Sequence, residues 1–362
     1  MTSPHQTPAP AWDSGPFRTA VQRTLDGFVD VQAARLADLG PDADRLIAAA
    51  REAVSGGKRF RAAFCYWGFR AVQDEGYDEQ RLVRAAAALE LLHASALVHD
   101  DYMDASDTRR GRPATHRAFE RQHRDAGWGG DPEQYGAAAA ILLGDLLLSW
   151  ADEMLRSCGF EEARVLDALG YFDTTRSEVI AGQFLDVSVQ ARRASDVAAA
   201  MTVLRYKSAK YSVERPLHIG AALAGASAEV LGGLSEFGLP LGEAFQLRDD
   251  LLGVFGDPGL TGKPAGDDLV EGKRTVLVAL ALEHAPAEQG RHLDERLGTS
   301  LDAAEVDVLR RIIEDSGAHT RVEEMIDELT ARCLDALAAA PVTASAKAVL
   351  RELATAATQR VV

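Results

Sequence analysis

The chain has 362 residues, of which 47% are hydrophobic, so it is long and apolar enough to bury a large core. Its formal net charge of −16 argues against nucleic acid as a partner, because a polyanion would be repelled. The three cysteines (Cys65, Cys158 and Cys333) form no Cys-x-x-Cys pair and indicate reduced thiols in a cytoplasmic protein. The longest apolar run, Ala137 to Trp150, is too short to span a bilayer, so no stable membrane insertion is expected.

Helical periodicity dominates the chain after its first residues. Residues 1–15 are rich in proline and are expected to form a disordered tail. Beyond them, apolar residues recur with helical spacing, and alternating β patterns bounded by turns are missing. The expected helices cover residues 81–98, 137–155, 161–189, 196–211, 228–255 and 274–283, with three more between 303 and 358. Residues 16–362 are therefore expected to form a single all-α domain, with about a dozen helices around a central bundle.

Two aspartate clusters end apolar helical runs. The first is His99-Asp100-Asp101-Tyr102-Met103-Asp104, and the second is Gln246-Leu247-Arg248-Asp249-Asp250. Asp100 and Asp104 are four residues apart, which places both carboxylates on one helix face, where they repel each other. A hard divalent cation such as Mg2+ binds carboxylate oxygens and would relieve that repulsion. The apolar flanks indicate that these carboxylates point into an interior or a cleft.

Basic residues accompany the acidic clusters. Arg109 and Arg110 follow the first cluster, and a third cluster, Gly56-Gly57-Lys58-Arg59-Phe60-Arg61, lies upstream. Carboxylates for metal together with Arg and Lys for oxyanions indicate a metal-bridged phosphate ester. Two loops rich in glycine, residues 123–134 and 256–271, follow the aspartate motifs and are placed to close over a ligand.

The order of these motifs resembles the trans-isoprenyl diphosphate synthases, or polyprenyl synthetases, and most of all a bacterial geranylgeranyl diphosphate synthase. The resemblance runs from Gly56 to Thr275. The matching motifs are Gly57-Lys58-x-x-Arg61, Leu91-Leu92-His93, Asp100-Asp101-x-x-Asp104, Arg109-Arg110-Gly111, Gly182-Gln183-x-x-Asp186, Lys207-Ser208, Phe245-Gln246-x-x-Asp249-Asp250, Gly262-Lys263 and Gly272-Lys273-Arg274-Thr275. It implies the isoprenoid synthase fold, a homodimer, and prenyl transfer from an allylic diphosphate to isopentenyl diphosphate.

The resemblance also implies a role for each matching residue. About three Mg2+ ions would be held by Asp100, Asp104 and Asp249, with Asp101 and Asp250 as supporting carboxylates. The allylic diphosphate would be bound by Arg109, Lys207, Lys263 and Lys273, and isopentenyl diphosphate by Lys58, Arg61, His93 and Arg110. Ser208 and Gln246 would face the carbocation and, with Lys207, form the catalytic set. Gln183 and Asp186 would shape the cavity or support Lys207.

Two departures from the family pattern carry consequences. Gly253 stands where most members have a third aspartate in the second motif, so activity is expected to persist with weaker Mg2+ affinity. Ser208 replaces the usual threonine and keeps its hydroxyl, which we interpret as neutral. An alternative interpretation of Gly253 is a weakly active subunit of a hetero-oligomeric synthase.

Two enzyme classes compete with this interpretation. A terpene cyclase of the same architecture would lack the isopentenyl diphosphate residues, which are all present here. A di-iron carboxylate bundle would use Glu-x-x-His pairs facing the core. This chain has two such pairs, at Glu90 and His93 and at Glu120 and His123. The second lies in a strongly polar stretch, residues 117–125, which we expect to be solvent-exposed.

The length of the product is predicted from the residues just before Asp100. The resemblance places the growing chain against Ser95 and Ala96, with Leu91 and Leu92 one turn deeper. Short-chain members carry bulky aromatic residues at the first level, whereas here both residues are small. Leu91 and Leu92, with walls from Val179 and Phe184, would then stop growth at about twenty carbons, as geranylgeranyl diphosphate. The alternative is a product of twenty-five carbons or more.

Overall fold

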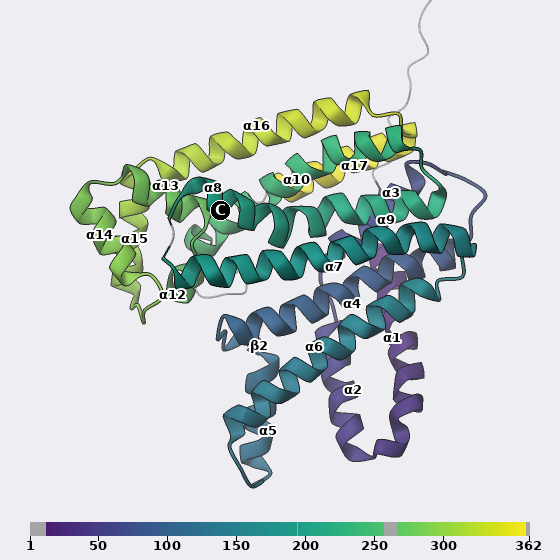
Figure 1. Ribbon diagram of the computed structural model, residues 1–362, viewed down its shortest axis with the longest axis horizontal. Coiled ribbons are helices and arrows are strands. Elements are labelled where there is room, and N and C mark those ends of the chain that lie inside the picture. Colours follow the sequence, from purple (N-terminus) through teal and green to yellow (C-terminus); the bar gives the residue numbers. More distant parts are fainter. Residues whose placement is uncertain (1–11, 194, 257–265, 360–362) are drawn as a thin grey trace, which may run out of the picture.

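The computed structural model describes residues 12–193, 195–256 and 266–359, and helices dominate those ranges (Figure 1). The prediction of an all-α protein is confirmed. Within the described residues, one small ribbon departs from it: β1 (Thr108–Arg109) pairs antiparallel with β2 (Arg112–Pro113). The ribbon follows the first aspartate motif closely. Arg109 lies in its first strand, and Arg110 lies in the turn between the two strands.

The helical elements follow the expected periodicity. The first half of the chain forms α1 (Ser14–Leu36), η1 (Ala37–Leu39), α2 (Pro41–Ala53), α3 (Phe60–Arg70), α4 (Glu79–Met103), α5 (Thr115–Asp125), α6 (Pro132–Arg156) and α7 (Glu162–Ala191). The second half forms α8 (Val197–Val203), η2 (Leu204–Glu214), α9 (Arg215–Ala224), α10 (Ala228–Phe255), α12 (Asp267–Glu271), α13 (Val276–His284), α14 (Ala287–Arg296), α15 (Ala303–Asp315), α16 (Ala318–Ala339) and α17 (Ala344–Thr358). The helix expected over 196–211 divides into α8 and the π-helix η2.

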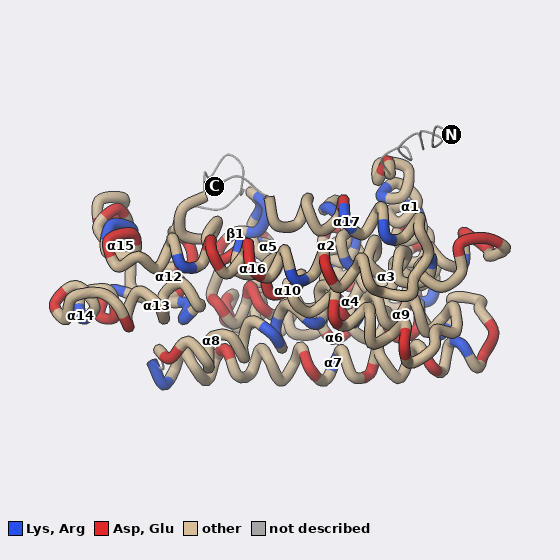
Figure 2. Tube along the Cα trace, turned by 90° about the horizontal axis from the view of Figure 1, so that it is seen from above, with Lys and Arg blue, Asp and Glu red and all other residues tan. Residues whose placement is uncertain are grey.

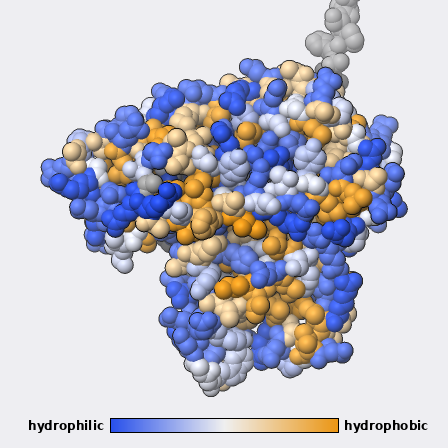
Figure 3. All heavy atoms as spheres, in the orientation of Figure 1, coloured by the Kyte–Doolittle hydropathy of each residue, from blue (hydrophilic) through white to orange (hydrophobic). Residues whose placement is uncertain are grey.

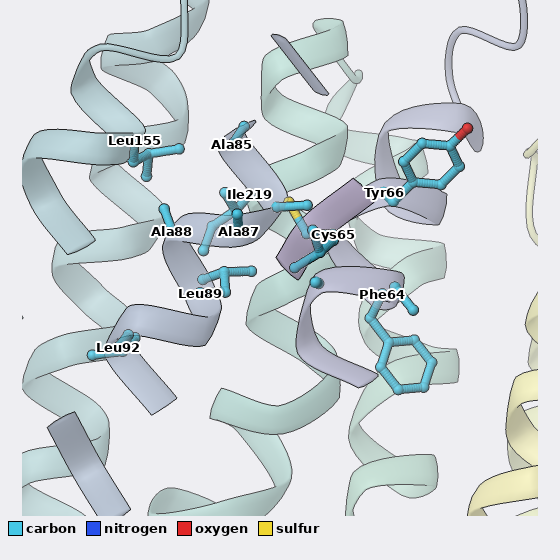
Figure 4. Close-up of a cluster of buried hydrophobic side chains, with 14 of the residues drawn as sticks. Phe64, Cys65, Tyr66, Ala85, Ala87, Ala88, Leu89, Leu92, Leu155 and Ile219 are labelled. Atoms are coloured by element: carbon cyan, nitrogen blue, oxygen red, sulfur yellow. The ribbon is translucent and has the colours of Figure 1, made fainter. Parts of the chain in front are cut away.

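Helix α4 forms the centre of the main hydrophobic cluster. Ala85, Ala87 and Ala88 are fully buried, and their small side chains let α4 pack closely beside α3 and α6. In Figure 4 they lie among Leu155 of α6 and Ile219 of α9. The helix is long and apolar enough to cross a membrane, but 72% of its most apolar window is buried inside the fold. Its composition is therefore that of a core helix.

Helix α10 joins this cluster to a second one formed by the C-terminal helices. Leu234, Phe237 and Leu241 belong to the first cluster, whereas Leu247 and Leu251 belong to the second. This continuity supports one domain over residues 16–362, which stays a prediction. Residues 1–11 of the expected tail lie outside the described residues. Trp12 packs against the core in a stack with Tyr66 at 6.3 Å, and α1 begins at Ser14.

The expectation for the polar stretch 117–125 is wrong. Helix α5 buries Glu120 and His123 against α6. The two helices approach closely because a Cβ at Gly136 would lie only 2.3 Å from the His116 carbonyl oxygen. Glu120 is compensated by Arg117, whose Nη1 donates to Oε2 at 2.9 Å, and by Arg124. Ion pairing within one helix turn therefore allowed a strongly polar sequence to face the core.

A buried histidine on α9 has a fixed neutral form. Arg215 Nη1 lies 3.2 Å from His218 Nδ1 and can only donate, so Nδ1 accepts. Nε2 faces Ser235 Oγ at 2.9 Å and the Leu231 carbonyl oxygen at 3.2 Å. Burial, and then the charge of Arg215, lower the pKa of His218 to about 4.

This lowered pKa predicts an acid-sensitive contribution to stability. Between the unfolded value of 6.5 and the folded value of about 4, the unfolded chain binds more protons at His218. The free energy of unfolding should therefore fall by up to about 1.4 kcal/mol per pH unit as the pH drops through that window. His218→Gln should show a shallower fall in urea unfolding measured between pH 7 and pH 5. Equal slopes in the variant and the wild type would contradict the assignment.

Candidate active site

A cavity of about 860 Å3 lies at the meeting point of α3, α4, α7, η2 and α10. Acidic and basic positions stand side by side around β1 and α12, near one part of its wall (Figure 2). The predicted residues at its lining are Lys58, Arg61, His93, Ala96, Asp100, Arg109, Arg110, Val179, Gln183, Asp186, Lys207, Ser208, Gln246, Asp249, Asp250 and Lys273. Segments separated by two hundred residues therefore contribute to one site. Lys263 lies outside the described residues.

The first aspartate motif forms one acidic wall. Lys207 Nζ lies 3.1 Å from Asp100 Oδ1, which also accepts a hydrogen bond from Gln183 Nε2 at 3.0 Å. Burial would raise the pKa of Asp100, but the charges of Lys207 and Lys273 outweigh it and lower the pKa. For Asp104, burial and the neighbouring charge of Asp100 raise the pKa to about 6. The two carboxylates also stand at the negative end of α4, where added cations are favoured.

Asp101 has a different role from its neighbours. Arg109 Nε donates to Asp101 Oδ1 at 2.8 Å, while Arg109 Nη2 stays 4.0 Å from Asp100 Oδ2. Burial alone would lower the pKa of Arg109, but its hydrogen bond and ion pair with Asp101 raise it. Asp101 therefore orients a fully charged guanidinium beside the acidic wall.

The π-helix η2 positions Lys207. A Cβ at Gly182 would lie 2.4 Å from the Lys207 backbone nitrogen, so this glycine lets α7 approach η2 closely. Asp186, one turn further along α7, accepts from Lys207 Nζ at 2.6 Å. Gln183 and Asp186 thus hold the two partners Asp100 and Lys207 from the same helix. π-helical turns are uncommon and frequently mark functional sites.

Helix α10 and the segment after it form the opposite acidic wall. Gln246 Nε2 donates to Asp250 Oδ1 at 2.8 Å, and burial, opposed by this bond, raises the pKa of Asp250. Lys273 Nζ lies 3.1 Å from Asp268 Oδ1 and 3.7 Å from Asp104 Oδ2. Lys273 therefore bridges the two acidic walls.

Asp268 occupies the space of the missing third aspartate. A Cβ built on Gly253 would lie 1.9 Å from Asp268 Oδ2. A side chain at position 253 would displace this carboxylate, so Asp268 of α12 lies where the third aspartate of the motif would begin. The sequence contained a signal for this residue, since Asp268 lies between two glycines, Gly266 and Gly272, in a segment next to Lys273. Sequence reasoning did not use that signal.

A separate group of cations lies at the α3 end of the cavity. Arg61 stacks on the Tyr211 ring at 4.1 Å and donates from Nη2 to Ser212 Oγ at 2.8 Å. His93 Nδ1 lies 2.6 Å from the Tyr211 hydroxyl. Burial, and then the nearby arginines, lower the pKa of His93, whereas burial raises the pKa of Tyr211 to about 12. The hydroxyl therefore keeps its proton, and the imidazole beside it stays neutral. Sequence reasoning missed Tyr211.

The predicted product-length residues separate into two groups. Ala96 lines the cavity, together with Val179 of α7. Ser95, Leu91 and Leu92 are buried but are not at the lining. Phe184 was expected to form a wall of the product cavity. In the single chain its side chain is 75% exposed, so this expectation is wrong for the isolated chain. The difference follows from helix geometry, because neighbouring residues point about 100° apart.

Comparisons with known proteins agree with this geometry. Residues 43–315 match the family model described as polyprenyl synthetase, which covers more than half of the chain. The chain belongs to the polyprenyl synthetase family. The isoprenoid synthase fold and the transferase activity predicted from the motifs are thereby confirmed, and the di-iron alternative loses its basis. This synthetase catalyses prenyl transfer.

Several relatives differ in the product that they are named for. A geranylgeranyl pyrophosphate synthase from Corynebacterium glutamicum, solved with isoprenyl diphosphate and magnesium, is 40% identical with a TM-score of 0.94, covering 96% of this chain and all of that one. A geranylfarnesyl diphosphate synthase from Aeropyrum pernix is 33% identical over 86% of this chain and 92% of its own length. A geranylgeranyl diphosphate synthase from Saccharolobus solfataricus is 33% identical over 67% of this chain and 68% of its own.

Proposed function

We propose that this synthetase condenses an allylic diphosphate with isopentenyl diphosphate and releases geranylgeranyl diphosphate as its main product. The observation that carries this proposal is one cavity with two chemically distinct polar ends. Facing acidic walls with Arg109, Lys207 and Lys273 form one end, and a cationic group without a facing aspartate pair forms the other. Two diphosphates, one bound with metal and one without, fit that division.

The donor set of the acidic end fits Mg2+. Asp100, Asp104 and Asp249 offer hard carboxylate oxygens, and burial, followed by the negative charge of Asp100, raises the pKa of Asp104 despite the nearby lysines. Among the described residues, no three such side chains converge closely enough to hold an ion alone. Mg2+ characteristically binds through one or two carboxylates plus substrate phosphates. We therefore infer that about three ions bind together with the allylic diphosphate. Asp268 would help to hold them, because Gly253 offers no carboxylate.

The polar residues divide the work of the reaction. Bound Mg2+ would neutralise the charge that develops on the leaving pyrophosphate. Arg109, Lys207 and Lys273 would hold the oxygens of that group, and Ser208 and Gln246 would stabilise the allylic cation. At the other end Lys58, Arg61 and Arg110 would bind isopentenyl diphosphate, with His93 as a neutral hydrogen-bonding group. The carbon–oxygen bond breaks, the new carbon–carbon bond forms, and the departing pyrophosphate accepts the final proton.

Product length follows from the apolar part of the lining. Ala96, Val179 and Leu204 border the cavity, so the growing chain would extend past a small residue at position 96. Leu92 lies four residues earlier on the same face of α4 and is packed in the buried cluster shown in Figure 4. We expect it to limit growth at twenty carbons. Chromatography of dephosphorylated products from the purified chain tests this expectation, and a main product of twenty-five carbons would contradict it.

An apolar surface supports the proposal of a homodimer. Ile141 and Leu142 of α6 and Ile180, Phe184 and Val187 of α7 are exposed, and apolar residues gather where these helices run (Figure 3). Such a continuous patch on a charged protein indicates a protein interface. Phe184→Glu should convert the dimer to a monomer in light-scattering measurements. A wild-type chain that is monomeric at micromolar concentration would contradict the proposal.

A further inference from the structure

Arg59 has an unusual place beside the isopentenyl diphosphate residues. It caps the start of α3 with φ of 58°, a left-handed conformation that costs a residue with a side chain about 1 kcal/mol. Its side chain is only 5% exposed, and Arg59 borders the cavity together with Lys58 and Arg61. A buried charge in a strained conformation persists only where the surrounding contacts determine it.

Glu90 supplies the principal contact. Its Oε2 accepts from Arg59 Nη1 at 3.1 Å, and its Oε1 accepts from the Ala62 backbone nitrogen at 3.1 Å. One buried carboxylate therefore pairs with Arg59 and satisfies an amide in the first turn of α3. Glu90 belongs to α4, one turn before His93. The contact thus joins the helix that carries His93 to the segment that carries Lys58 and Arg61.

The preceding loop is held by the same group of contacts. Arg59 Nη2 donates to the Val54 carbonyl oxygen at 2.6 Å, which closes the loop 54–59 on itself. Gly56 donates its backbone N–H to Gln22 Oε1 at 3.1 Å, and Arg110 Nη1 donates to the Ser55 carbonyl oxygen at 3.0 Å. The backbone of this loop therefore also positions the guanidinium of Arg110.

Electrostatics explains why such an anchor is needed. Lys58, Arg61 and Arg110 are gathered in one end of the cavity, where they repel each other. Burial, and then Arg59 and Arg109, lower the pKa of Arg110, whereas Glu90 acts in the opposite direction. The Glu90 carboxylate, whose oxygens bind Arg59 and the Ala62 amide, offsets part of this repulsion at the same end of the cavity.

We propose that the buried Arg59–Glu90 pair is a positioning device for the isopentenyl diphosphate site. It holds loop 54–59 and the start of α3 against α4, so that Lys58, Arg61, His93 and Arg110 converge before the substrate arrives. The proposal rests on the assignment of this end of the cavity to isopentenyl diphosphate. Arg59 and Glu90 border the cavity, but each side chain is only 5% exposed, and their polar atoms are bound to each other, to the Val54 carbonyl oxygen and to the Ala62 amide. We therefore assign both as positioning residues.

Arg59→Gly separates the anchor from the backbone conformation. Glycine adopts positive φ without strain, so this variant removes the whole side chain, guanidinium included, and leaves the left-handed backbone conformation accessible. We expect KM for isopentenyl diphosphate to rise about 10- to 100-fold, because misplacing binding groups by an ångström has effects of that size. KM for the allylic diphosphate should stay within twofold. Glu90→Gln keeps the side-chain shape but loses the charge, and it should give the same selective rise.

Glu52→Gln is the matched control. Glu52 pairs with Arg112 at 3.1 Å on the solvent-exposed side of the same region, and both side chains are more than half exposed. This variant should change neither KM by more than twofold. Circular dichroism at the assay temperature verifies that each variant is folded.

Two outcomes would overturn the positioning role. One is an unchanged KM for isopentenyl diphosphate in folded Arg59→Gly, and the other is an equal rise in both KM values, which indicates general loosening. Hydrogen exchange gives a readout that does not depend on activity: amides of residues 55–59 should exchange at least tenfold faster in Arg59→Gly than in the wild type. If the wild type is active, and Arg59→Gly changes neither the amide exchange of residues 55–59 nor KM for isopentenyl diphosphate, only the positioning role is refuted. A wild type that forms no isopentenyl-dependent product would refute the proposed function instead.

Discussion

Asp100→Asn should lower kcat by about 10²- to 10³-fold at saturating Mg2+ and substrates. The change keeps the size of the side chain and removes one negative charge from the acidic wall of α4. Lys207 lies 3.1 Å and Gln183 3.0 Å from Asp100 Oδ1, so the variant loses the ion pair with Lys207 and, under the proposed function, a metal ligand. Steady-state measurement of pyrophosphate release gives kcat directly.

A nearby aspartate provides the control for this variant. Asp107 pairs with Arg117 at 2.8 Å and is 77% exposed, so Asp107→Asn should keep kcat within twofold. Both variants carry the same change in net charge and lie within eight residues of each other. More than a tenth of wild-type kcat in Asp100→Asn would show that Asp100 is not a metal ligand.

Ala96→Phe should shift the main product from twenty to fifteen carbons. Ala96 is at the cavity lining, and a phenyl ring there would occupy the volume into which the chain grows. Nearly all of the product should shift to fifteen carbons, because a cavity filled by the phenyl ring cannot accept five more carbons. Chromatography of the dephosphorylated products measures it.

Ser95→Phe distinguishes the cavity face of α4 from its packed face. Ser95 is 3% exposed and is not at the cavity lining, so phenylalanine should overpack the core, at a cost of about 1–3 kcal/mol, without shortening the product. Lower thermal stability with unchanged product length is therefore expected. A shortened product from Ser95→Phe, with none from Ala96→Phe, would reverse the assignment of the two faces.

The sequence was sufficient for the features that depend on local chemistry. Repulsion between Asp100 and Asp104 follows from a spacing of four residues, and the structure places them at one end of α4 beside Lys207 and Lys273. Helix starts are similarly local, as at Asp78, whose Oδ1 accepts from the Gln80 backbone nitrogen at 2.9 Å. Such features need only neighbours in the chain.

Features that depend on tertiary contacts could not be predicted in this way. Helix α4 is apolar on nearly every side, so its sequence does not show whether Ser95 or Ala96 meets the cavity. Asp268 lies against Gly253 because two segments meet in space. Glu90 accepts a hydrogen bond from Arg59, which lies 31 residues earlier in the sequence. In α5, Glu120 is buried because arginines of its own helix compensate it.

Removal of metal tests the central claim most directly. The purified chain should convert isopentenyl diphosphate and an allylic diphosphate to a longer prenyl diphosphate with Mg2+, and the pyrophosphate released should equal the bonds formed. Asp100 and Asp249 line the cavity. Under the proposal that they and Asp104 act through metal, excess chelator should abolish both products, and added Mg2+ should restore them. Full activity in the presence of chelator would contradict a metal-assisted ionisation at this site.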